Sequence, residues 1–325
     1  MKASLLVLSM FSMASAAFFA AGAGYQVVER LPLGAATKWD CIALDEIRQR
    51  LFVTRGDHID VVAVATGKII STIADTQGVH GVALAQDLKL GFTSNGKTNS
   101  VTVFDLDSLK PSAEIKVTGA NPDAILYEAS VHKLFVFNGG SANVDVIDAK
   151  TLKVIATVKA TGRPEFAVTD GKGKIYFNIE DNAGINVIDV ASSKVIASWR
   201  LEGCDEPTGL AIDIKSSRLF SACRNSIMAV TDARTGRRIT QFSIGEKPDA
   251  VIFDEETRTV LTSGGGGTGS LTVTNQDDAD HYSLRGSVVT ENGAKTMVMD
   301  GKSKTVFLPT VVGNKFVVLV VAKHQ

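Results

Sequence analysis

One sequence pattern recurs seven times along this chain of 325 residues. Each unit contains a polar residue, a short apolar run, a turn residue and a second apolar run. Successive anchor residues at the turn are 40, 43, 42, 43, 41 and 46 residues apart. A period near 40 with strand-type patterning predicts the blades of a β-propeller rather than a helical solenoid. The anchors are Asp45, Ala85, Glu128, Asp170, Asp213, Asp254 and Asp300.

The fifth unit indicates how one blade is built. It has four runs of strand length, at 208–212, 218–222, 227–231 and 238–242, separated by turn residues. Four short antiparallel strands make one blade. An aspartate leads the turn between the third and fourth runs in several units, and there its carboxylate is expected to bond backbone amides rather than carry chemistry. These turn residues are Asp105, Asp148, Asp189 and Asp232.

The last unit is one strand short. It offers runs at 296–299, 305–308 and 316–321, whereas residues 25–33 precede the first unit without a blade of their own. We expect this N-terminal strand to complete the last blade, because that pairing removes two open sheet edges. The predicted fold is therefore all-β: a seven-bladed propeller of four antiparallel strands per blade, closed by the N-terminal strand.

The first 23 residues have the pattern of a secretory signal peptide. They contain one lysine, an apolar stretch from Leu5 to Phe11 and two Ala-x-Ala sites. A retained membrane anchor is the alternative, but small residues interrupt the apolar run before it reaches spanning length. No later segment is expected to cross a membrane. We therefore expect residues 24–325 to form the propeller in the periplasm or outside the cell.

The charge balance disfavours nucleic acid as a partner. The chain has 34 Lys and Arg residues against 35 Asp and Glu residues, and removal of Lys2 with the leader makes the net charge more negative. Binding to single-stranded nucleic acid needs a basic track and stacking aromatic residues. Only four Tyr and two Trp are present.

The three cysteines leave at least one thiol unpaired within the chain. Cys204 precedes the first run of the fifth unit and Cys223 follows its second run. A disulfide between them fits an oxidising compartment, although sequence alone cannot test its geometry, and both outcomes stay open here. Cys41 lies in an alternating apolar run and is interpreted as a small core residue.

A candidate ligand site follows from the propeller geometry. The first strand of each blade lines the central channel, so the residue five before each anchor should recur at one level around the channel mouth. Water in a channel attracts polar side chains in any propeller, which is the plain structural alternative. Converging carboxylates could instead hold a hard cation such as Ca²⁺ or Mg²⁺. The predicted ring comprises Asp40, His80, Asp123, Glu165, Thr208, Asp249 and Lys295.

Further residues are expected at the rim of this mouth. Trp39 and Phe166 neighbour the ring and could form apolar walls. Four polar residues fall at or just past the ends of second strands, where loop packing is the alternative to ligand contact. They are Arg55, Asn95, Asn138 and Arg224.

No local motif assigns a reaction. The run at 264–269 is glycine-rich but lacks the Lys-Ser/Thr and helix of a P-loop, so we interpret it as a hairpin. The chain contains no G-x-S-x-G, H-E-x-x-H or C-x-x-C sequence.

The repeats resemble the YVTN or YncE-like seven-bladed propellers. The resemblance rests on segments such as RLFVT, FTSNGKTNSVTVFD, RPEFAV and EPTGLAID, and it covers residues 25–325. It implies an exported binding or scaffold protein. Distantly similar propellers include lactone-hydrolysing enzymes with a divalent metal in the channel, for which Glu165, Asn95, Asn138 and Asp249 are conceivable ligands.

Three functions follow as hypotheses. The first is a binding protein that takes a small molecule, a metal or a protein partner at the channel mouth. The second is a metal-dependent hydrolase, with Asp40, Asp123, Glu165 and Asp249 as ligands or general base and His80 as proton carrier. The third is a docking ring that acts through its loops and tolerates loss of the ring charges.

Overall fold

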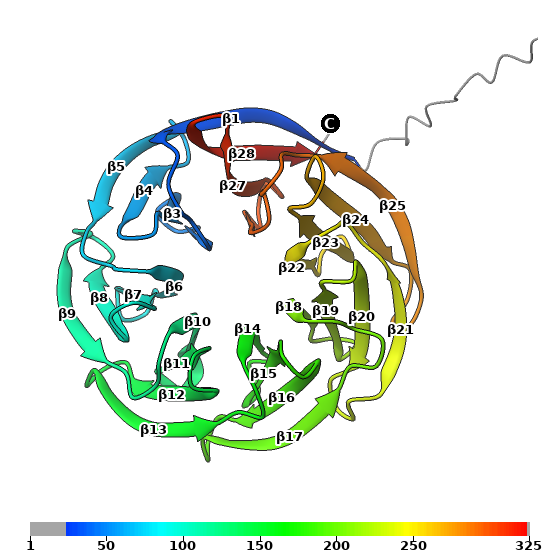
Figure 1. Ribbon diagram of the computed structural model, residues 1–325, viewed down its shortest axis with the longest axis horizontal. Helices are drawn as coiled ribbons and strands as arrows, with labels where there is room; N and C mark the ends of the chain where they lie inside the picture. Colours follow the sequence, from blue (N-terminus) through cyan, green and yellow to red (C-terminus); the bar gives the residue numbers. More distant parts are fainter. Residues whose placement is uncertain (1–23, 324–325) are drawn as a thin grey trace, which may run out of the picture.

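The computed structural model describes residues 24–323. The expected signal peptide at residues 1–23 lies outside them. The chain forms seven four-stranded antiparallel sheets arranged in a ring (Figure 1). The predicted all-β, seven-bladed fold is therefore confirmed. Within residues 24–323 no helix is long and apolar enough to span a membrane.

In the first six blades the chain runs outward from a channel-lining strand. The sheets are β2 (Ile42–Asp45), β3 (Arg50–Thr54), β4 (Ile59–Ala63) and β5 (Lys68–Ile73); β6 (Val79–Ala85), β7 (Leu90–Asn95), β8 (Ser100–Asp105) and β9 (Pro111–Lys116); and β10 (Pro122–Glu128), β11 (Lys133–Asn138), β12 (Asn143–Asp148) and β13 (Lys153–Lys159). A short 3₁₀ turn, η1 (Ala129–Val131), joins β10 to β11.

The next three blades repeat this arrangement. They consist of β14 (Pro164–Thr169), β15 (Lys174–Ile179), β16 (Gly184–Asp189) and β17 (Lys194–Arg200); β18 (Pro207–Asp213), β19 (Arg218–Cys223), β20 (Ile227–Asp232) and β21 (Arg238–Ser243); and β22 (Pro248–Asp254), β23 (Thr259–Gly264), β24 (Ser270–Gln276) and β25 (Tyr282–Val289).

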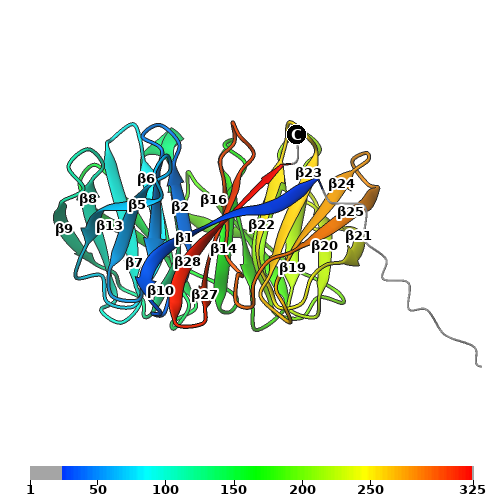
Figure 2. The same ribbon diagram turned by 90° about the horizontal axis from the view of Figure 1, so that it is seen from above.

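The seventh blade joins the two ends of the chain. Its order is β26 (Val298–Met299), β27 (Val306–Val312), β28 (Lys315–Lys323) and β1 (Tyr25–Ala35). Figures 1 and 2 show β1 lying along β28 at the outer edge. The closing strand is therefore confirmed. The expected first strand at 296–299 is shorter, because tight backbone bonds such as Lys295 N to Gly293 O keep the chain in a turn before Val298.

Apolar side chains between neighbouring sheets hold the ring together. Phe52 of the first blade meets Phe104 of the second with ring centroids 5.5 Å apart, and both are fully buried. Phe137 and Phe177 repeat this contact between the third and fourth blades at 5.1 Å. Fully burying one such side chain contributes about 1.5–3 kcal/mol. The blades therefore pack on both faces, as their Val, Ile, Leu and Phe content predicts.

The two faces of the ring are defined by the two ends of the channel-lining strands. Asp40 lies just before β2, on what we call the mouth face, and Asp45 ends β2 on the opposite, turn face. At the turn face Asp45 Oδ1 accepts hydrogen bonds from the amides of Ile47 and Arg48 at 3.1 and 3.0 Å. Asp148 does the same for Lys150 and Thr151, as predicted for the turn aspartates.

Candidate functional site

A cavity of about 280 Å³ opens where the channel-lining strands begin at the mouth face. All seven predicted ring residues line it, although they come from seven different blades. The repeat period therefore identified one level of the channel correctly. The lining also includes Phe166 and Arg224, both expected at the rim. Among the lining residues that were not predicted are Arg163, Glu180 and the free cysteine Cys41.

Charged side chains form a chain of alternating sign around one half of this cavity. Lys295 Nζ lies 2.6 Å from Asp249 Oδ2 and 4.0 Å from Asp40 Oδ1. His80 Nδ1 lies 2.6 Å from the other oxygen of Asp40 and 3.7 Å from Asp123 Oδ1. Asp40 is thus shared between Lys295 and His80.

Two arginines continue the chain around the other half. Arg163 lies 4.0 Å from Asp123, 3.4 Å from Glu165 and 2.9 Å from Glu180. Arg224 Nη2 lies 3.6 Å from the second oxygen of Glu180. Arg163 therefore links three carboxylates from two neighbouring blades, and the ring is an ionic network rather than a set of separate polar groups.

Asp123 and Glu165 have no hydrogen-bond donor in residues 24–323 for their carboxylates, only the longer ion pairs described above. Burial raises the pKa of Asp123 to about 6, although His80 opposes the shift. Burial, with added repulsion from Asp123 and Glu180, raises the pKa of Glu165 to about 9. The side chain of Glu165 is 11% exposed. At neutral pH Glu165 therefore holds a proton that a positively charged group could displace, whereas Asp123 is mostly ionised.

The pKa values of His80 and Lys295 are both raised, which favours their charged forms. Burial would lower the pKa of His80, but the hydrogen bond to Asp40 and the charge of Asp123 outweigh it, so the pKa is raised. Burial likewise opposes the charge of Lys295, whereas Asp249 and Asp40 raise its pKa. On the Asp40 side of the mouth, the aspartates therefore stabilise the charged forms of His80 and Lys295. On the Glu165 side, burial and carboxylate repulsion outweigh the charge of Arg163.

Hydroxyl groups from neighbouring blades fix the backbone of the ring. Thr296 Oγ1 donates to the carbonyl of Asp40 at 2.6 Å, and Ser94 Oγ donates to the carbonyl of Asp123. Thr208 Oγ1 donates to the carbonyl of Pro248 at 3.2 Å and is almost fully buried. Thr208 therefore lines the cavity but is already bonded, and we assign it a bracing role.

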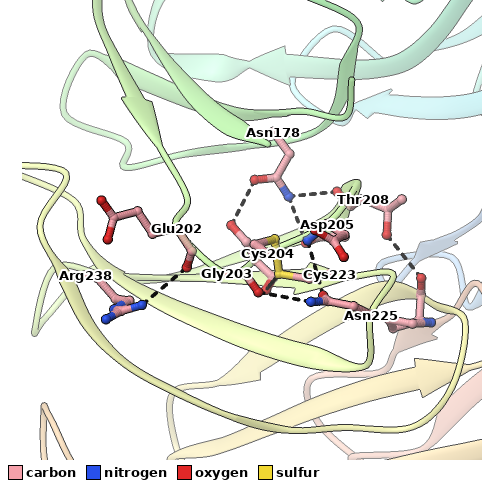
Figure 3. Close-up of a disulfide and its surroundings, with 12 residues drawn as sticks. Asn178, Glu202, Gly203, Cys204, Asp205, Thr208, Cys223, Asn225 and Arg238 are labelled. Carbon is pink, nitrogen blue, oxygen red and sulfur yellow. Dashed lines mark hydrogen bonds between the residues drawn. A yellow bond between two sulfur atoms is a disulfide. The ribbon is translucent and has the colours of Figure 1, made fainter. Parts of the chain in front are cut away.

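A disulfide joins Cys204 to Cys223 beside the mouth (Figure 3). It fastens the loop before β18 to the end of β19. The backbone amide of Arg224 then donates to the carbonyl of Asp205 at 2.7 Å, and Arg224 Nε lies 2.6 Å from Glu206 Oε2. The disulfide is thus adjacent to the backbone that presents Arg224 to the cavity.

Two rim predictions are corrected by the structure. Asn95 and Asn138 are buried inside their blades, where Asn95 Nδ2 donates to Thr102 Oγ1 at 2.8 Å and Asn138 Nδ2 donates to Asn143 Oδ1 at 2.9 Å. Each is the last residue of a strand, and successive strand residues face opposite sides. A ligand at the mouth therefore does not meet either amide.

Arg55 also differs from the prediction. It is 4% exposed, pairs with Asp60 at 2.6 Å and donates to the carbonyls of Leu33 and Ala35 at 3.0 and 2.9 Å. Its guanidinium lies 4.0 Å from the ring centroid of Phe316. Arg55 therefore fastens the end of β1 to the first blade, and its role is ring closure.

The groups closest to a metal-ligand arrangement are Asp40, His80 and Asp123, whose ligand atoms lie within 4.8 Å of one another. One imidazole nitrogen and two carboxylate oxygens suit a divalent cation. The 2.6 Å bond between His80 and Asp40 would have to open to admit it. Asp249 is paired with Lys295, so the predicted carboxylate set divides into two parts.

No protein-family model and no curated protein sequence matches this chain. Solved structures do match. The RRP9 WD40 repeats are 10% identical with a TM-score of 0.78, covering 91% of this chain and 97% of that one. A chain of a mitotic checkpoint complex is 13% identical with a TM-score of 0.79, and the match covers 98% of both chains. A chain of the Kuenenia stuttgartiensis hydrazine synthase is 14% identical with a TM-score of 0.77, and the match covers 88% of this chain and 97% of that one. At such identities the likeness shows the seven-bladed fold alone.

Proposed function

We propose that this protein is an exported, YVTN/YncE-like propeller that binds a small ligand at the channel mouth through a cationic group of the ligand. Residues 1–23 would act as the signal peptide and place the propeller in the periplasm or outside the cell. The observation that carries the proposal is the pair Asp123 and Glu165, two largely buried carboxyls that line the cavity, accept no hydrogen bond from the described chain and have only ion pairs of 3.4 Å or longer.

The energetics favour a positively charged ligand. A buried ionised carboxylate is costly without a partner, so in the free protein Glu165 holds a proton at neutral pH and Asp123 holds one below about pH 6. An ammonium or guanidinium group would supply both the charge and the missing donors, and charge-assisted hydrogen bonds are about twice as strong as neutral ones. Binding at neutral pH would then release a proton from Glu165.

The proposal is tested by titrating the protein with ethylammonium and guanidinium in a calorimeter. We expect saturable binding that strengthens from pH 5 to pH 9, because Asp123 and Glu165, with pKa values of about 6 and 9, ionise across that range. Glu165→Gln should weaken binding about tenfold. Asp148→Asn, at the turn face, is the matched control and should change nothing. Absence of binding to either cation, or unchanged affinity in Glu165→Gln, would refute the proposal.

A metal-dependent hydrolase is the second candidate, and the Asp40, His80 and Asp123 cluster favours it. These residues would hold a divalent cation, whose chemistry would be to polarise the carbonyl of an ester or lactone. Glu165 lines the same cavity and would move a proton. Elemental analysis of the purified protein, with thermal melts before and after chelation, tests this function. A protein without stoichiometric metal and with an unchanged melt excludes it.

A further inference from the structure

A second cavity of about 520 Å³ adjoins the mouth. Asp40 and His80 line both cavities, so these two side chains form the boundary between them. We call the second cavity the lysine groove. Away from the boundary it is lined by Lys38, Trp39 and Lys97, among others. The two cavities therefore meet at the bonded pair Asp40 and His80, and a ligand that binds in both would pass over these two side chains.

Two glycines build the floor of the lysine groove. Gly56 and Gly78 have φ values of +80° and +69°, a left-handed conformation that favours glycine. Their backbones are bonded to each other, with Gly78 N donating to Gly56 O at 2.7 Å. A Cβ added at Gly78 would lie 2.7 Å from Lys97 Cγ, and one at Gly56 would lie 3.4 Å from Lys38 Cβ. The stems of both lysines thus lie against this floor.

The two cavities differ in which charged groups lack a close partner. The mouth brings together five carboxylates with Lys295, His80, Arg163 and Arg224, and two of these carboxylates, Asp123 and Glu165, have only ion pairs of 3.4 Å or longer. The groove adds only one further carboxylate, Asp57, which is bonded to His58 at 2.7 Å. Lys38 and Lys97 make no ion pair with any described residue. Arg55 is neutralised by Asp60. The groove therefore offers two uncommitted ammonium groups to an anion.

We infer that the ligand is an extended zwitterion, of the class of short peptides with free termini, whose ammonium group enters the mouth and whose carboxylate reaches Lys38 and Lys97. This inference rests on the proposed function, because it assumes that a cationic group of the ligand binds at the mouth. It adds a binding place for the carboxylate at the other end of the ligand. Trp39 lines the lysine groove and lies between Lys38 and Asp40 in the chain. It packs edge-on against Phe316, with ring centroids 5.6 Å apart, and would contact the middle of the peptide.

Oligoglycines of two to five residues provide a molecular ruler, because an extended chain adds about 3.3 Å per residue. We expect affinity to rise with length until the carboxylate reaches the lysine groove and then to level off. At that length, amidation of the C-terminus should weaken binding about fivefold, as expected for a solvent-exposed ion pair. Acetylation of the N-terminus should weaken it about tenfold or more.

The double variant Lys38→Gln/Lys97→Gln tests the binding of the peptide's carboxylate separately from the binding of its ammonium group. It should bind the free and the amidated peptide equally, while keeping its sensitivity to N-acetylation. Lys110→Gln/Lys172→Gln, two exposed lysines at the turn face, is the matched control and should retain the fivefold effect of amidation.

Two results overturn the inference, and they are distinguishable. If ethylammonium binds but amidation and the double lysine variant have no effect on peptide affinity, the proposed function stands and the zwitterionic ligand is wrong. If neither ethylammonium nor any oligoglycine binds, the mouth itself does not take a cation and both fail together.

Discussion

Carboxylates gather at both faces of this propeller, and their environments are opposite. At the turn face, amide and hydroxyl donors of Thr151 lower the pKa of Asp148. At the mouth face, burial without donors raises the pKa of Asp123 and Glu165. An acidic residue in a repeat is therefore structural where a tight turn directs backbone amides at its carboxylate. It is available to bind a ligand where the neighbouring amides are already bonded within the strands of a sheet.

The largest expected effect is at the turn face. Asp232 pairs with Arg218 at 3.0 Å, both side chains are 8% exposed, and Asp232 also accepts from the amides of Arg234 and Thr235. Asp232→Ala would leave Arg218 with fewer partners and open the turn. We expect a loss of about 2–3 kcal/mol in the free energy of unfolding, measured by urea titration at pH 7.

Asp123→Asn at the mouth is the comparison for this variant. It removes a carboxyl that accepts no hydrogen bond from the described chain, so its free energy of unfolding should change by less than about 0.5 kcal/mol or increase. Equal destabilisation by Asp232→Ala and Asp123→Asn would break the distinction between the two faces.

A smaller effect of opposite sign is expected for Glu165→Gln. The pKa of Glu165 is about 9 in the folded protein against an ordinary value of 4.5. Between these values the folded state binds a proton that the unfolded state has lost, so stability falls as pH rises. The variant lacks this dependence and should be more stable than the parent by about 1–2 kcal/mol at pH 8. Urea titrations at pH 4 should show no such gain, and an equal gain at both pH values would contradict the assignment.

The smallest effect is expected for Asp148→Ala, which removes an exposed turn cap. The lowered pKa of Asp148 means that its contribution is present above the ordinary carboxyl pKa and is lost as pH falls through the folded value. We expect about 0.5 kcal/mol of destabilisation at pH 7 and none near pH 2, from urea titrations at both pH values. A destabilisation that persists at the lower pH would mean that the carboxylate charge is irrelevant to the turn.

The sequence was sufficient for the blades and the ring of seven residues, because a fixed period places equivalent residues at one height. It was insufficient for the rim residues at the ends of the second strands, where a shift of one position decides whether a side chain reaches the cavity. Asn95 and Asn138 end their strands and point into the blade, whereas Arg224 and Glu180 follow strand ends and reach the cavity. A shift of one residue reverses the direction of a strand side chain. The same rule applied one position later would have found Glu180.

Arg163 could not be located by the repeat. It lies in the connection before β14, and such connections vary in length and conformation between blades. Its contacts with Asp123, Glu165 and Glu180 depend on side-chain direction rather than strand register. A charged residue two positions before the ring was the available signal. The equivalent positions in the other units differ in charge and polarity, so the period alone did not single out Arg163; they are Lys38, Gly78, Asn121, Glu206, Lys247 and Gly293.

The pairing of Tyr25 with Lys323 across the seventh blade has a consequence for how the chain matures. Six blades can assemble from contacts between neighbouring segments as synthesis proceeds. The seventh blade cannot, because β1 precedes and β28 follows all the other described strands. The ring therefore cannot close before β28 is present, in whatever order the other six blades fold, and β1 has no strand partner until then.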